Sequence, residues 1–193
     1  MKEHKAILFS SFVFLVGISS GVFLEIFMNP ADKLQMADFL ANYLFQGADS
    51  ALTYPTPFFT SAAGNLFLLL LIFLSGLSAI GFPAAYVVLL YKGAALGFAA
   101  GILIENFAFQ GALSLALTMF PQNIILIPAF IVATTAAQQY GLEAVSVLRR
   151  GKRQKMKSNL RGNGRRYLIT NAVLAGVIVL GCTIEGLLAL IVA

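Results

Sequence analysis

Five long apolar stretches, separated by short polar segments, dominate the hydropathy pattern of this 193-residue chain. A membrane-spanning helix needs about 20 mainly apolar residues. The stretches that come close to or exceed this length are residues 6–27, 64–91, 93–110, 112–139 and 167–193. The pattern predicts an all-α, polytopic membrane protein in which about five transmembrane helices form one integral membrane domain, residues 1–193.

The first stretch starts like a signal peptide but exceeds the roughly 7–15 residues of a signal-peptide core, and no clean small-residue cleavage site follows. We therefore expect it to be a retained anchor helix. Gly17 and Gly21 lie four residues apart and permit close contact with another helix. Gly93, Gly97 and Gly101 repeat this spacing along the third stretch. We expect that stripe to pack within the chain, although a contact with a partner protein is the alternative.

Residues 29–57 follow a different pattern, with polar positions spaced by threes and fours. This spacing predicts an amphipathic helix that is too polar to span the membrane. We expect it to lie on the extracytoplasmic membrane surface. The alternative is that its apolar face docks an extracytoplasmic partner. The residues of that candidate docking face are Leu34, Leu40, Tyr43 and Leu44.

Two apolar stretches contain helix-disrupting residues. Residues 64–91 are too long for one upright span, and Gly81 and Pro83 predict that this segment is kinked, strongly tilted or broken into two half-helices. A second disruption lies between Pro121 and Pro128, next to the polar pair Gln122 and Asn123. It predicts either a packing kink or a discontinuous helix that binds ions or substrate.

The charge distribution predicts the orientation. The chain is 59% hydrophobic and only 11% charged, and nine of its thirteen Lys and Arg residues fall in a predicted cytoplasmic loop, residues 149–166. Basic residues near span ends stay in the cytoplasm, which favours a cytoplasmic N-terminus and an extracytoplasmic C-terminus. In this arrangement Lys92 marks the cytoplasmic end of the second span, and only Lys33 lies outside. The basic loop contains no aromatic residue, so we expect anionic lipid headgroups rather than nucleic acid as its counter-charge.

Few residues offer chemistry inside the membrane. Glu105 and its neighbour Asn106 are predicted to lie roughly 18 Å deep in the third span, with no Lys or Arg at that depth. Glu25 is predicted to lie at the outer water interface. With one cysteine, Cys182, and one histidine, His4, we expect no metal, no other cofactor and no catalytic constellation. We therefore do not expect an enzyme.

Several segments carry a family resemblance. They are Gly64-Asn65, the run from Ser75 to Pro83 with Gly76 and Gly81, Tyr91-Lys92-Gly93 with Gly97, and Pro121-Gln122-Asn123 through Pro128 to Ala129. With these residues the chain resembles the stage II sporulation protein M family over nearly its whole length.

The resemblance implies an integral protein of the mother-cell or septal membrane that acts during engulfment of the forespore. It further implies a scaffold that recruits and localises peptidoglycan-degrading partners, the stage II sporulation proteins D and P, and is not itself a hydrolase. Whether it forms a homo-oligomer stays open. The alternative function is a small transport permease, or a permease subunit that needs a separate ATPase; the interrupted helices and Glu105 motivate it.

Overall fold

The computed structural model describes residues 2–45, 57–78, 81–114, 120–150 and 153–192, and every long element in them is an α-helix. The helices are α1 (Lys2–Ile26), α2 (Pro30–Phe45), α3 (Pro57–Leu77), α4 (Phe82–Ser114), α5 (Phe120–Arg150) and α6 (Arg153–Val192). All except α2 contain a segment that is long and apolar enough to cross a membrane. The predicted all-α polytopic class with five spans is therefore confirmed.

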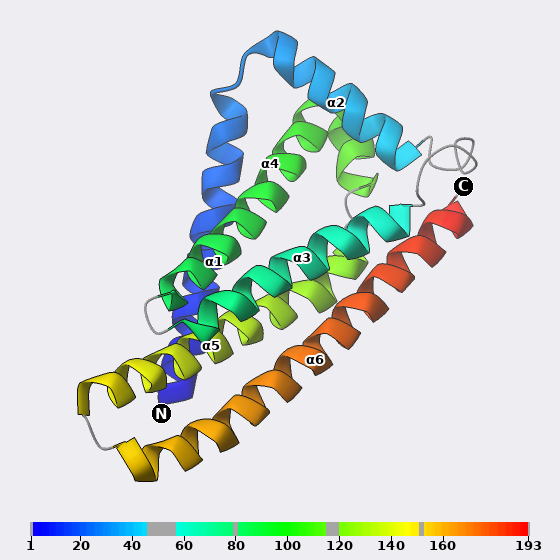
Figure 1. The fold of residues 1–193 in the computed structure, drawn as a ribbon. Helices are drawn as coiled ribbons and strands as arrows, with labels where there is room; N and C mark the ends of the chain where they lie inside the picture. The colour runs from blue at the N-terminus through cyan, green and yellow to red at the C-terminus, as the bar shows by residue number, and fades with distance from the viewer. Residues whose placement is uncertain (1, 46–56, 79–80, 115–119, 151–152, 193) are drawn as a thin grey trace.

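The helices form two groups that pack together (Figure 1). In the first group α1 lies along α4, and in the second α3, α5 and α6 lie side by side. The start of α1, the end of α5 and the start of α6 lie at one end of the bundle, whereas α2 and the C-terminal end of α6 lie at the other. This arrangement matches a cytoplasmic N-terminus and basic segment with α2 on the outer side. The basic segment itself is largely helical rather than a loop, because α5 continues to Arg150 and α6 begins at Arg153.

The predicted second and third spans were placed wrongly. The break near Gly81 is real, but it separates two different spans, Phe59–Leu77 and Phe82–Phe107. Residues 64–91 are thus neither one tilted helix nor one span in two halves, and α4 runs without interruption through Lys92. Pro83 lies in the first turn of α4, where its missing N–H group costs no helical hydrogen bond. A Cβ atom on Gly81 would lie 2.9 Å from the Ser75 carbonyl oxygen, so the turn is too tight for a side chain there.

The fourth and fifth spans are also shifted from their predicted bounds. The fourth span is Pro121–Ser146 rather than residues 112–139, and the fifth begins at Gly162 rather than at residue 167. Pro121 begins a helix instead of interrupting one, and α5 continues past Pro128. Pro128 lies on an exposed face of α5, so its ring does not disturb the packed side.

The shared core joins α3, α4, α5 and α6. Its largest fully buried apolar side chains are Ile72, Leu89, Leu126, Phe130 and Ile178. Large apolar side chains also cover the outside of the bundle, as on α1, where Leu8, Phe12 and Leu15 are more than half exposed. An apolar exterior is expected for helices whose surroundings are lipid.

Candidate functional site

The closest helix contact is between α1 and α4, and four glycines make it possible. A Cβ atom on Gly17 would lie 2.5 Å from the Leu90 carbonyl oxygen, and one on Gly93 would lie 2.6 Å from a carbonyl oxygen of α1. Cβ atoms on Gly21 and Gly97 would likewise meet backbone carbonyl oxygens of the facing helix. The structure thus places these glycines in a contact within the chain, which we call the glycine interface.

Gly101, the next residue of the stripe, faces a carboxylate instead of a backbone. A Cβ atom there would lie 3.2 Å from Oε2 of Glu25, so the missing side chain makes room for this buried acid. Lys33 of α2 completes the site: its Nζ lies 2.8 Å from Oε1 of Glu25 and 2.7 Å from Oε2 of Glu105. We call Glu25, Lys33 and Glu105 the outer ion cluster. It links the end of α1, the start of α2 and the outer part of α4.

The outer ion cluster corrects two predictions. Glu105 was predicted to lie deep in the membrane without a basic partner, but it lies 23 residues, roughly 34 Å, from the start of α4. It therefore lies near the end of the span Phe82–Phe107, about half exposed and paired with Lys33. The error follows from starting the third span at Gly93 instead of Phe82. Asn106, also exposed, donates a hydrogen bond from Nδ2 to the Ile102 carbonyl oxygen of its own helix at 2.9 Å.

Glu25 does lie at the outer end of α1, as predicted, but it is buried and ion-paired rather than simply hydrated. The two carboxylates also affect Lys33. Hydrogen bonds to Glu105 and then to Glu25 raise the pKa of Lys33 above its ordinary value of 10.5. The ammonium group is accordingly charged at physiological pH, and it compensates a carboxylate that would otherwise be buried alone.

The faces of α2 are arranged differently from the predicted docking surface. Ala37 is buried and Leu40 is half-buried, and α2 packs against α4. Leu34 points elsewhere and is 61% exposed. The side chains of Tyr43 and Leu44 lie outside the described residues. The exposed part of α2 carries the polar side chains Asp32, Gln35 and Asp38 together with the apolar side chains Leu34 and Phe39.

A second polar site lies within the membrane-spanning bundle. It comprises Ser61 and Asn65 of α3, Lys92 of α4, Gln122 of α5 and Cys182 of α6, and we call it the core polar cluster. Lys92 Nζ donates to Asn65 Oδ1 at 2.7 Å, and Gln122 Nε2 donates to Ser61 Oγ at 2.8 Å. Asn65 Nδ2 donates to the Ser61 carbonyl oxygen at 2.9 Å, and Gln122 Nε2 lies 3.4 Å from Cys182 Sγ.

Lys92 is the residue that sequence reasoning missed. It lies ten residues into α4, roughly 15 Å from the cytoplasmic end of the helix, which is near the middle of a bilayer core of about 30 Å. Its Nζ also lies 5.7 Å from the ring centre of Phe130, within range of a cation–π interaction. The signal that could have found it was Gly81 with Pro83: if a helix starts there, Lys92 must be intramembrane.

The other residues of the resemblance are divided between this cluster and helix contacts elsewhere in the bundle. Asn123 is buried beside Gln122 in α5. Gly76 faces α5 and α6, because a Cβ atom on it would meet Ala137 and the hydroxyl group of Tyr167. That hydroxyl donates to the Phe73 carbonyl oxygen at 3.0 Å. Asn65 and Gln122, which are 57 positions apart in the sequence, thus meet at one site, whereas Gly76 and Gly81 shape the packing and the turn.

Within the described residues, no group of three or more His, Cys, Asp or Glu side chains is arranged to hold a metal ion. The side chains brought together in the core polar cluster are a lysine, two amides, a hydroxyl and a thiol. Such groups exchange hydrogen bonds across helices and fix their relative rotation. The outer ion cluster does the same for α1, α2 and α4 through charge.

Five helices that are long and apolar enough to span a membrane, and a sixth helix, α2, tied to them by ion pairs, define a polytopic helical membrane protein. The sequence model of the stage II sporulation protein M family matches residues 10–189, nearly the whole chain. The chain therefore belongs to this family, and its membership indicates a membrane protein related to sporulation. No match was found among the curated proteins or among the solved structures.

Proposed function

We propose that this protein is a non-catalytic membrane scaffold that recruits and localises peptidoglycan-degrading proteins during forespore engulfment. Family membership supports the sporulation context. The observation that carries the scaffold role is the fixed position of α2 on the outer side, where the outer ion cluster ties it to α1 and α4. Its partners in this proposal are hydrolases of the stage II sporulation D and P type, and its location is the mother-cell or septal membrane.

The outward face of α2 is the surface that we assign to partner binding. Asp32, Gln35 and Asp38 are exposed on it, whereas the apolar residue Ala37 is used for packing against the bundle. Polar and charged groups on an interface give a partner its orientation and register. A helix held by ion pairs also loses little conformational freedom when it binds.

The transport alternative receives less support from the geometry. One of its motives was Glu105 inside the membrane, and this residue lies at the outer surface beside Lys33. Its other motive was a discontinuous helix at mid-membrane depth. The Gly81 break lies at the cytoplasmic end of two spans, and both α4 and α5 run on through their described residues.

Affinity purification of the tagged full-length protein from sporulating cells, followed by mass spectrometry, tests the scaffold proposal. We expect cell-wall hydrolases to co-purify, and Asp38→Lys to reduce their recovery severalfold while the membrane level of the protein stays unchanged. Glu143→Lys is the matched control, because it makes the same charge change on an exposed residue at the cytoplasmic end. Recovery of an ATPase without hydrolases would contradict the scaffold proposal and support the permease alternative.

A further inference from the structure

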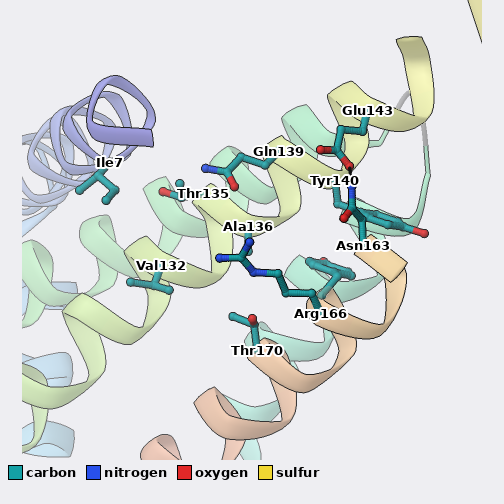
Figure 2. A pocket seen from close by; sticks show the side chains of 11 residues that line it. Ile7, Val132, Thr135, Ala136, Gln139, Tyr140, Glu143, Asn163, Arg166 and Thr170 are labelled. Carbon is teal, nitrogen blue, oxygen red and sulfur yellow. Dashed lines mark hydrogen bonds between the residues drawn. The ribbon is translucent and has the colours of Figure 1, made fainter. Parts of the chain in front are cut away.

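A groove of about 310 Å³ lies between α5 and α6 near their cytoplasmic ends, with Ile7 of α1 at its edge. It is separate from both polar clusters described above. Figure 2 shows the Arg166 side chain extending from α6 across the groove toward α5, while Glu143 and Asn163 meet at one end. The groove therefore combines a cation with both polar and apolar walls.

The polar wall contains hydrogen-bond donors that have no partner among the described residues. In the part of the chain that the structure describes, the Arg166 guanidinium has no hydrogen-bond or ion-pair partner. The Gln139 amide and the Thr170 hydroxyl, which line the same groove, also have none there. A guanidinium offers five N–H donors in a planar fork that matches the oxygen atoms of a phosphate group.

The nearby acid does not neutralise this cation. Asn163 Nδ2 donates to Glu143 Oε2 at 2.7 Å, so the Glu143 carboxylate is held at one end of the groove and makes no ion pair with Arg166. An anion that approaches Arg166 consequently does not have to displace an internal ion pair.

The depth of the groove suits a lipid headgroup. Arg166 lies four residues, roughly 6 Å, inside the start of the last span, Gly162–Ile184. Beside it Tyr140 and Tyr167 stack with ring centres 4.9 Å apart, and tyrosines are enriched where the acyl chains meet the headgroups. Farther from the cytoplasmic end the groove is lined by Val132 and Ala136, which provide an apolar surface for an acyl chain.

We propose that this groove binds the phosphate group of an anionic phospholipid from the cytoplasmic leaflet, with Arg166 as the principal phosphate contact. Gln139 and Thr170 donate to the phosphate oxygens, and the first part of an acyl chain lies along Val132 and Ala136. The basic run at residues 149–166 raises the local concentration of anionic lipid. Arg166 then binds one of these lipid molecules, and the bound lipid bridges α5 and α6.

Native mass spectrometry of the full-length protein in a neutral detergent tests this site, with phosphatidylglycerol as the probe and phosphatidylcholine as the zwitterionic comparison. We expect one tightly bound phosphatidylglycerol. Arg166→Gln should weaken its binding on the order of tenfold, as expected for loss of a charge-assisted phosphate contact. Arg165→Gln is the matched control, because this exposed neighbour does not line the groove, and it should change the affinity less than about twofold.

Two further measurements separate the site from general charge attraction and from misfolding. Three results would each overturn the proposal. They are an equal loss of lipid affinity in Arg166→Gln and Arg165→Gln, equal binding of phosphatidylglycerol and phosphatidylcholine, and displacement of the bound lipid by equimolar inorganic phosphate. Ala136→Leu keeps every charge and fills the apolar part of the groove. We expect it to weaken lipid binding with an unchanged melting temperature, and full binding by this variant would refute the acyl-chain placement.

Discussion

Replacement of Gly93 by alanine is the most direct perturbation of the packing between α1 and α4. The new Cβ atom would lie 2.6 Å from the Phe14 carbonyl oxygen and 3.1 Å from the Ile18 backbone nitrogen, whereas ordinary contact begins at 3.4 Å. Both neighbours are backbone atoms of a helix, so neither can rotate away as a side chain would. The two helix axes must therefore move apart by a large fraction of an ångström along the contact.

The cost of this separation follows from typical values for overpacking. Extra methyl groups forced into a packed interior cost about 1–3 kcal/mol, and an immobile carbonyl puts Gly93 at the upper end of that range. Alanine recovers about 1 kcal/mol of helix propensity relative to glycine. We expect a net destabilisation of about 2 kcal/mol, which lowers the melting temperature of a chain of this length by about 4–8 °C.

Gly176→Ala provides the matched control. Gly176 lies in α6, and a Cβ atom on it would have nothing within 4 Å. The Gly176→Ala variant gains the same helix propensity without a steric clash, so its melting temperature should equal or exceed that of the wild type. Unfolding can be followed with a thiol-reactive dye, because Cys182 is the only cysteine and is fully buried. If Gly93→Ala melts within one degree of Gly176→Ala, the backbones of α1 and α4 are not in contact.

The two polar clusters and the single thiol give four further predictions. Lys33→Met should lower the melting temperature more than Glu105→Gln, because it leaves a buried carboxylate without its cation, whereas the Glu105 side chain is half exposed; the reverse order would contradict the assigned pairing. Since the pKa of Lys33 is raised above 10.5, its ion pairs stabilise fully below that pH and are lost as the pH rises through the raised pKa. Proteins that keep Lys33 should therefore lose additional stability at alkaline pH. An equal alkaline loss of stability in Lys33→Met would contradict this assignment to Lys33. Asn65→Leu should destabilise the protein by about 1–3 kcal/mol, because it removes the acceptor for Lys92 Nζ. In a double-mutant cycle of thermal melts, adding Lys92→Met should restore part of that stability. If the effects of the two substitutions simply add, the Lys92–Asn65 hydrogen bond is not present. Cys182 should react with maleimide in native membranes only after SDS is added, and rapid labelling of untreated membranes would show that the core is open.

Hydropathy was sufficient to predict the number of spans, but not where two of them meet. In an apolar run from Gly64 onward the chain offers two candidate turns, Gly81 with Pro83 and the charged residue Lys92. The charge of Lys92 suggested a turn at that residue, whereas backbone chemistry suggested a turn at Gly81 and Pro83. Backbone chemistry decides here, because lysine is a good helix former, whereas proline fits best in the first turn of a helix. A lysine can remain in the membrane when a neighbouring span supplies an acceptor, as Asn65 does.

The sites were predictable only in part, for the same reason. The spacing of Gly17, Gly21, Gly93 and Gly97 indicated tight packing, but it could not say that the two pairs face each other. Likewise, Asn65 and Gln122 both belong to the segments of the family resemblance, but nothing in the sequence indicated that they approach the same hydroxyl group, that of Ser61. Contacts between segments this far apart depend on helix register, and a register shift of about 1.5 Å per residue is invisible in a composition or a period.

The glycine interface and the outer ion cluster act on the same pair of helices, and together they fix where α2 lies. Because the backbones of α1 and α4 touch at Gly17 and Gly93, α1 cannot slide along α4 without lifting over carbonyl groups. In that register Glu25 packs against Gly101, which has no side chain, and Lys33 Nζ of α2 lies 2.8 Å from Glu25 Oε1. A slip of one helical turn, about 5.4 Å, would take the carboxylate out of reach. The position of the outer helix, and of any partner surface on it, is thus determined by residues that lie inside the membrane.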